Sequence, residues 1–280
     1  MIISAGQTVL VTGASGGLGT CFTLALARYK VKLALVAYPG TGLEALCQQV
    51  KQQGGSAAYL AADLRSPTER HEVVEFVHKE FGEIDVLINN AGVEFTSAYE
   101  DLTEQNIEDI LRVNLEAPMV LTRLVLPEML RRGRGHIVNV SSLAGKAGPA
   151  YQEPYAASKA GLIAFTSSLR ATYRGTGVSA SVICPGFVEA GIYQNLKKQT
   201  GFSAPTLLGT SKPEKVAAAL IRAINSDLPE VVVNALPVRP LFATTAMFPR
   251  LGEFLTRQTG AHVFFKKVAA GLKSSANQNR

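Results

Sequence analysis

The chain has 280 residues, of which 47% are hydrophobic and 18% are charged. A chain of this length and composition can bury a large core, and we expect one globular domain. It contains no proline-, serine- or glutamine-rich tract of the kind that marks disorder or a long linker. The net charge is +6, but the basic residues before position 239 are dispersed and form no recognisable motif, so we predict no nucleic-acid partner.

The N-terminus and the cysteines indicate a cellular compartment. The first apolar run, residues 7–12, begins too early to leave room for a secretory leader. Three cysteines, Cys21, Cys47 and Cys184, lie in apolar segments without metal-ligand spacing. We therefore predict a cytoplasmic protein without a metal site, in which the cysteines are small buried hydrophobic side chains.

Seven apolar runs, most of them rich in Val, Ile or Leu, are typical of buried strands. They lie at 7–12, 31–37, 57–61, 84–88, 135–140, 178–184 and 230–234. Stretches with helical spacing alternate with them, near 17–30, 43–53, 68–81, 104–132, 155–175 and 213–226. This alternation predicts a Rossmann-like, doubly wound parallel sheet of seven strands in a three-layer α/β/α fold. Ligands bind such sheets at the carboxyl ends of the strands.

A glycine-rich loop follows the first predicted strand and runs directly into the first predicted helix. An isolated stretch of this kind would more often be a plain turn. At this place, however, glycines let a pyrophosphate approach the free N–H groups of the helix. We therefore predict that the loop binds a dinucleotide through Gly13, Ser15, Gly16, Gly17, Leu18 and Gly19.

The end of the second predicted strand, residues 35–39, bears on which dinucleotide is preferred. It contains no carboxylate to bind a ribose 2′-hydroxyl, which removes the usual support for NAD(H). It also contains no Arg or Lys to hold a 2′-phosphate, although Ser15 could donate one hydrogen bond. We expect NADP(H) in preference to NAD(H), with Tyr38 among the cofactor contacts.

Two further segments follow predicted strands. The fourth strand ends in Asn89, Asn90, Ala91 and Gly92, polar and small residues that suit a backbone facing a ligand. Asp63 follows the third strand, where a carboxylate commonly caps a turn. We predict cofactor contacts from Asn90, Ala91 and Gly92.

Tyr155 and Lys159 are four residues apart at the start of a predicted helix, so their side chains share one face. In isolation such a pair is usually a surface contact. Free tyrosine has a pKa of about 10 and a nearby ammonium lowers it, so Lys159 would tune Tyr155 as a general acid or base. Ser141 and Ser142 follow the fifth strand at the same edge of the sheet, where a hydroxyl can bind the reacting oxygen.

Together these motifs resemble the short-chain dehydrogenase/reductase family over about residues 7–234. The matching features are the TGxxxGxG pattern, the NNAG segment and the Tyr155-x3-Lys159 pair. A serine thirteen residues before the tyrosine belongs to the pattern, which selects Ser142. The resemblance implies that Tyr155 exchanges the proton, that Ser142 positions the carbonyl or alcohol, and that Lys159 also holds the nicotinamide ribose.

The resemblance also assigns roles to residues that no local pattern singles out. Asn114 matches the asparagine that supports a proton-relay water, although an Asn within a long helix otherwise bonds locally. Asp63 and Leu64 match a pair beside the adenine. The long helices 104–132 and 155–175 resemble those through which family members pair, so we expect a homodimer or homotetramer.

The segment after the sixth strand resembles the one that flanks the nicotinamide in this family. It supplies Pro185, Gly186 and Val188, with a backbone contact from Val188 to the carboxamide. A threonine often found two residues later is Ala190 here, which removes one cofactor hydrogen bond.

The substrate side is less regular. Residues 187–212 predict a partly apolar lid or a loop packed on the core. We divide the chain into a catalytic domain, 1–238, and a C-terminal extension, 239–280, with helical segments near 249–258 and 261–272. The extension holds seven basic residues and one acidic residue, so the whole positive excess lies there. Its longest uncharged run, residues 240–249, is too short to cross a bilayer. The extension could instead touch a membrane surface, cover the active site or pack against another subunit.

These features predict an oxidoreductase that interconverts a carbonyl and a secondary alcohol with NAD(P)(H), acting as a reductase of a hydrophobic or lipid-like ketone. Its partner is then a small-molecule carbonyl or alcohol substrate. Two alternatives remain: a non-catalytic dinucleotide-binding or scaffold protein, and an epimerase or dehydratase that retains its cofactor.

Overall fold

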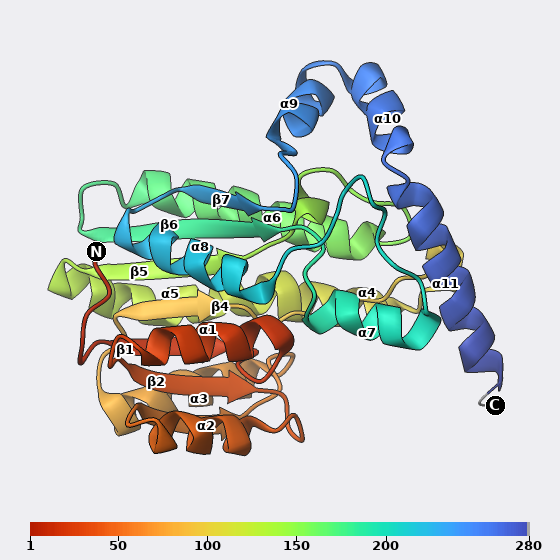
Figure 1. Cartoon of the computed structure of the whole chain (residues 1–280). Helices are drawn as coiled ribbons and strands as arrows, with labels where there is room; N and C mark the ends of the chain where they lie inside the picture. Colours follow the sequence, from red (N-terminus) through yellow and green to blue (C-terminus); the bar gives the residue numbers. More distant parts are fainter. Residues whose placement is uncertain (279–280) are drawn as a thin grey trace.

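The computed structural model describes residues 1–278 and shows one parallel sheet with helices on both faces (Figure 1). The sheet has seven strands in the order β3-β2-β1-β4-β5-β6-β7. They are β1 (Thr8–Thr12), β2 (Lys32–Ala37), β3 (Ser56–Ala61), β4 (Val86–Asn89), β5 (Gly135–Val140), β6 (Val178–Pro185) and β7 (Glu230–Val233). The predicted doubly wound fold is confirmed, and the strand order reverses between β1 and β4, beside the glycine-rich loop.

The strand side chains alternate between two buried layers. In β1, Val9 and Val11 face one layer and Leu10 faces the other. The first layer contains α1 (Gly17–Ala27), α2 (Leu43–Gln52) and α8 (Pro213–Asn225). The second contains α3 (Pro67–Phe81), α5 (Ala117–Arg132) and α6 (Glu153–Thr172). Helices shield both faces, which is why the strands lack polar alternation.

The stretch predicted as one helix over 104–132 is two helices joined by a π-helical turn. α4 (Glu104–Leu111) ends where the turn Arg112–Glu116 begins, and α5 follows at once. Such turns are frequent at functional sites. This one holds Asn114 with its side chain fully buried. No glycine or proline lies within 112–116, so the sequence pattern does not mark the turn.

The substrate loop and the C-terminal extension contain more helix than their sequence patterns predict. α7 (Gly191–Thr200) lies within the predicted lid, and α9 (Arg239–Met247) precedes α10 (Pro249–Gln258) and α11 (Ala261–Gln278). α7 and α11 share an apolar cluster made of Tyr193, Leu196, Phe264, Phe265 and Val268. The loop is therefore packed against the extension, whereas α9 and α10 form a hairpin that rises above the sheet (Figure 1).

The structure also bears on the expectations that the chain has no membrane-spanning helix and that its cysteines are buried. No helix within residues 1–278 is long and apolar enough to cross a bilayer. Arg280, the last basic residue of the extension, lies outside the described residues. Cys47 and Cys184 are buried and Cys21 is half-buried, and all three thiols are free.

Candidate active site

A cavity of about 680 Å³ opens at the carboxyl edge of the sheet. Its walls come from the loops that follow β1 to β6, from the start of α6 and from the C-terminal extension. Every residue predicted for the site lines this cavity except Gly19 and Asn114. Segments far apart in the sequence thus meet where a doubly wound fold binds its ligand.

The glycine-rich loop packs so closely that side chains could not be accommodated. A Cβ atom on Gly17 would lie 2.3 Å from the backbone nitrogen of Gly191. A Cβ atom on Gly19 would lie 2.0 Å from the carbonyl oxygen of Gly13, so Gly19 closes the turn instead of facing the cavity. The remaining loop residues lie at the N-terminus of α1, whose free N–H groups suit a pyrophosphate. The cradle therefore fits a dinucleotide.

The NNAG segment braces this cradle. The side-chain amide of Asn90 donates hydrogen bonds to the carbonyl oxygens of Thr12 and Gly13, each at 3.0 Å. In return, the Thr12 hydroxyl oxygen accepts hydrogen bonds from the backbone N–H groups of Asn90 (3.0 Å) and Ala91 (3.1 Å). The loops after β1 and β4 are therefore held as one unit.

The sequence patterns do not single out Arg65, a basic side chain that lines the cavity beside Tyr38, after the end of β2. Arg65, from the loop after β3, places its guanidinium 5.6 Å from the ring centroid of Tyr38. It also forms ion pairs with Asp63 at 2.7 Å and with Asp109 at 2.8 Å. Hydrogen bonding from Arg65 lowers the pKa of Asp63. The Ser15 hydroxyl, in the glycine-rich loop, donates a hydrogen bond of 2.6 Å to the hydroxyl oxygen of Thr41, which follows β2.

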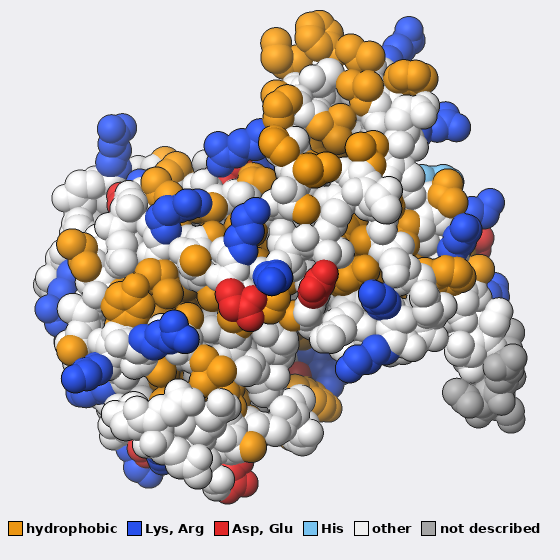
Figure 2. Space-filling model, viewed as in Figure 1, with side chains coloured by type: hydrophobic (Ala, Val, Ile, Leu, Met, Phe, Trp, Pro, Cys, Tyr) orange, Lys and Arg blue, Asp and Glu red, His pale blue; other side chains and the backbone are white. Residues whose placement is uncertain are grey.

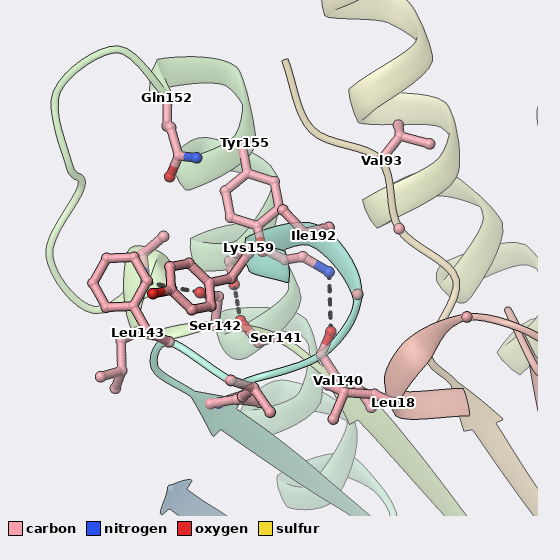
Figure 3. A pocket seen from close by; sticks show the side chains of 18 of the residues that line it. Leu18, Val93, Val140, Ser141, Ser142, Leu143, Gln152, Tyr155, Lys159 and Ile192 are labelled. Carbon is pink, nitrogen blue, oxygen red and sulfur yellow. Dashed lines mark hydrogen bonds between the residues drawn. The ribbon is translucent and has the colours of Figure 1, made fainter. Parts of the chain in front are cut away.

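Tyr155 and Lys159 project from α6 toward the end of β5, where Ser142 lies (Figure 3). The Lys159 ammonium donates to the carbonyl oxygen of Val140 at 3.0 Å and lies 5.7 Å from the ring centroid of Tyr155. The Ser141 hydroxyl donates to the backbone oxygen of Lys159 at 2.8 Å, so it is used within the fold. The Ser142 oxygen accepts a 3.1 Å bond from the backbone of Ala144, which leaves its proton to be donated.

Asn114 stands behind these residues and not in the cavity wall. Its side chain accepts from the backbone N–H of Val93 at 2.8 Å and donates to the Val93 carbonyl at 2.9 Å. It also donates to the Ser158 hydroxyl at 3.2 Å. A Cβ atom on Gly92 would lie 3.4 Å from both the Asn114 oxygen and the Lys159 nitrogen, so the glycine lets the two side chains converge.

The ionisation of the pair differs from the sequence-based expectation. Burial raises the pKa of Tyr155 to about 12, and a hydrogen bond with Ser142 offsets only part of that effect. Burial also lowers the pKa of Lys159 to about 8. The Tyr155 pKa is therefore raised in this structure and not lowered as expected from Lys159, because burial penalises the phenolate. At neutral pH the phenol keeps its proton.

The segment after β6 lies along the cavity. The backbone N–H of Ser211 donates to the Phe187 carbonyl at 2.8 Å, and that of Glu189 donates back to Ser211 at 3.0 Å. These two bonds hold Val188 in extended backbone at the cavity wall. Beyond the catalytic residues the wall is apolar and includes Leu143, Phe187, Ile192, Leu241, Phe242 and Phe265. α9 and α11 thus cover part of the active site.

A sequence model of the family described as short chain dehydrogenase matches residues 7–201. The chain belongs to the short-chain dehydrogenase/reductase family. It is 43% identical over 233 residues to the ketoacyl reductase HetN of Nostoc sp. strain PCC 7120, covering 83% of this chain and 80% of that one. It is 31% identical over 219 residues to the 3-oxoacyl-[acyl-carrier-protein] reductase FabG of Thermotoga maritima, covering 77% of this chain and 89% of the relative.

A solved structure of a family member supports the same assignment. A metagenomic short-chain oxidoreductase in complex with NADP superimposes with a TM-score of 0.70 at 31% identity, over 82% of this chain and 97% of that chain. This short-chain dehydrogenase is therefore an NAD(P)-dependent oxidoreductase that acts as a carbonyl reductase. The predicted family, fold and reaction class are confirmed.

Proposed function

We propose that this short-chain dehydrogenase uses NADPH to reduce a hydrophobic ketone, such as a 3-oxoacyl chain. The observation that carries the proposal is Tyr155, a buried phenol beside Lys159 and Ser142 at the wall of a largely apolar cavity. Such a group is a proton donor, as carbonyl reduction requires. Two relatives carry the names ketoacyl reductase and 3-oxoacyl-[acyl-carrier-protein] reductase, which supports an oxoacyl substrate.

The proposed mechanism assigns one task to each residue. The hydroxyl groups of Ser142 and Tyr155 hold the carbonyl oxygen by hydrogen bonds. The glycine-rich loop and the NNAG segment would hold NADPH, which would supply the hydride that the carbonyl carbon accepts. As negative charge develops on the oxygen, Tyr155 donates its proton, and the ketone becomes a secondary alcohol. The Lys159 ammonium stabilises the phenolate that remains. Asn114 supports the water through which the phenol recovers its proton.

Consumption of NADPH by purified protein tests the reaction. We expect turnover of a series of ketones to rise with chain length, because longer chains bury more apolar surface in the cavity. Net oxidation of NADPH excludes an epimerase or dehydratase, which would return its cofactor unchanged. Tight cofactor binding without turnover of any ketone would favour the non-catalytic dinucleotide-binding protein or scaffold.

The preference for NADP(H) over NAD(H) rests on charge at the adenosine end. No carboxylate lies within residues 38–43, directly after β2, where one would repel a 2′-phosphate. Arg65 lies over the Tyr38 ring and is paired with Asp63 and Asp109. Replacement of Arg65 by Gln is expected to weaken NADPH binding while leaving NADH binding little changed. An equal loss of affinity for NADPH and NADH would show that Arg65 stabilises the loop and does not bind the 2′-phosphate.

We infer a cytoplasmic homo-oligomer. Three free thiols are consistent with a reducing compartment. Leu111 of α4 and Met119 of α5 are 39% and 43% exposed, on the helices expected to pair. Light scattering coupled to size exclusion distinguishes the dimer, the tetramer and the monomer, and a monomer at micromolar concentration would contradict the inference.

We also propose peripheral membrane contact through the α9–α10 hairpin. Its large apolar side chains are exposed: 72% for Met247, 58% for Phe248, 49% for Leu251 and 58% for Phe254. Figure 2 shows hydrophobic side chains gathered over the hairpin, with basic side chains at its margin. An apolar surface with a basic border suits the interface of an anionic membrane.

Vesicle co-sedimentation tests this contact. The full-length protein is expected to bind vesicles that contain phosphatidylglycerol more strongly than vesicles of phosphatidylcholine alone. A variant that combines Phe248→Ser with Phe254→Ser should lose binding. Ile2→Ser is a matched control, since Ile2 is 71% exposed at the opposite end of the chain. Binding that is equal in both variants, or absent in the wild type, would contradict the proposal.

A further inference from the structure

Gln152 is a buried side chain in the cavity wall that the catalytic mechanism does not use. It stands immediately before α6 and three residues before Tyr155, so the two side chains are neighbours along the helix (Figure 3). Only 4% of its surface is exposed, yet it lines the cavity. Its small accessible surface therefore faces the substrate space.

The amide nitrogen of Gln152 is fully occupied. Nε2 donates one hydrogen bond to Glu94 Oε1 at 2.9 Å and another to Thr96 Oγ1 at 3.0 Å. The Thr96 hydroxyl in turn donates to the same Glu94 oxygen. A primary amide has two N–H hydrogens, and both are used here. Neither Glu94 nor Thr96 lines the cavity, so these two residues hold Gln152 from behind.

The carbonyl oxygen of Gln152 is left without a protein partner. Within residues 1–278, Oε1 accepts no hydrogen bond, and it is not one of the fully buried atoms that lack a partner, so it is accessible from the cavity. While Glu94 is ionised, the amide cannot turn over without aiming its carbonyl at the carboxylate, where two acceptors would face each other. Burial raises the pKa of Glu94, so this constraint holds at pH values above that pKa. The oxygen is therefore a fixed acceptor in a cavity whose other walls are mostly apolar.

We propose that Gln152 Oε1 is a specificity determinant that accepts a hydrogen bond from a hydroxyl or amide N–H on the substrate, and that Glu94 and Thr96 are positioning residues for it. The inference rests on the proposed carbonyl reduction at Tyr155, because the donor belongs to the ketone being reduced. A ketone that fills the cavity but lacks a donor displaces water from this acceptor and leaves it unpaired, so the site discriminates against such an analogue. The preferred substrate is then a hydrophobic ketone that carries one hydrogen-bond donor.

Matched ketones test the proposal with the full-length protein and NADPH. Each pair consists of a hydroxy ketone and its methyl ether, with the hydroxyl two, three or four carbons from the carbonyl. The wild type is expected to prefer the hydroxy ketone, at one of these spacings, by about tenfold or more in kcat/KM. Gln152→Leu should remove that preference, so that the kcat/KM values for the hydroxy ketone and its methyl ether agree within about threefold. Gln48→Leu, on the exposed face of α2, is the matched control and should keep the preference.

The positioning role has its own readout. Glu94→Gln keeps the size of the side chain but lets the Gln152 amide turn over, so the preference should fall while NADPH affinity is retained. A wild type without preference at any spacing, or a Gln152→Leu variant that loses both activities equally, overturns the inference and leaves carbonyl reduction intact. A wild type that reduces no ketone overturns the proposed function and this inference with it.

Discussion

The buried lysine beside Tyr155 should lower the stability of the protein. Burial lowers the pKa of Lys159 from 10.5 to about 8, which corresponds to about 3 kcal/mol of unfavourable burial of the ammonium at neutral pH. Lys159→Met removes that cost and keeps most of the side-chain volume. It also removes the 3.0 Å hydrogen bond to the Val140 carbonyl, a loss of about 1 kcal/mol. We therefore expect a net gain of about 2 kcal/mol in unfolding free energy at pH 7, with loss of activity.

The pH dependence of this gain gives the sharper test. A lysine whose pKa is lowered by folding binds its proton more weakly in the folded state. The wild type therefore gains stability as the pH rises from about 8 to about 10.5, and the advantage of Lys159→Met should fall to near zero at about pH 10. Urea unfolding without cofactor at pH 7 and pH 10 measures both values. Lys198→Met, on the exposed face of α7, is the control. A Lys159→Met variant that is destabilised at pH 7, or whose gain is the same at both pH values, would refute the reasoning.

Two further substitutions probe the cofactor cradle and the π-helical turn. Gly17→Ala should weaken NADPH binding more than tenfold in a fluorescence titration, because its Cβ would lie 2.3 Å from the Gly191 nitrogen. Gly40→Ala, at a φ of +77° with open space around it, should cost about 1 kcal/mol of stability and leave binding unchanged. Equal affinities of the two variants for NADPH would contradict the assignment of the glycine-rich loop as the dinucleotide site. Asn114→Ala should lower kcat at least tenfold and reduce Tm, since the Val93 backbone loses two hydrogen bonds; an unchanged kcat would show that Asn114 has only a local structural role.

Much of the fold follows from local sequence, because its signals are periodic. Apolar runs bounded by helical patterns predict all seven strands, and their order along the chain predicts a parallel sheet. The π-helical turn around Asn114 escapes prediction because its residues are ordinary helix formers and the turn depends on packing against Val93 and Ser158. α7 escapes because its stability depends on apolar contacts with α11, far along the chain.

The site divides in the same way. The glycine-rich loop, the NNAG segment and the Tyr155-x3-Lys159 pair can be found in the sequence because each is contiguous and has a fixed spacing. Arg65 and Gln152 cannot be found in this way, since their importance depends on partners from other loops. The pKa of Tyr155 also depends on enclosure by the whole fold, because burial raises it, and the spacing of Tyr155 and Lys159 does not reveal that burial.

The transfer of deuterium from NADPH labelled at the nicotinamide C4 position tests the central claim most directly. With a hydrophobic ketone, the wild type should place the label on the carbinol carbon of the product alcohol. Tyr155→Phe should bind NADPH with nearly unchanged affinity and form product at least about a hundredfold more slowly, because the proton donor is missing. Rapid labelled product from Tyr155→Phe, or wild-type product without deuterium on that carbon, would contradict carbonyl reduction at Tyr155.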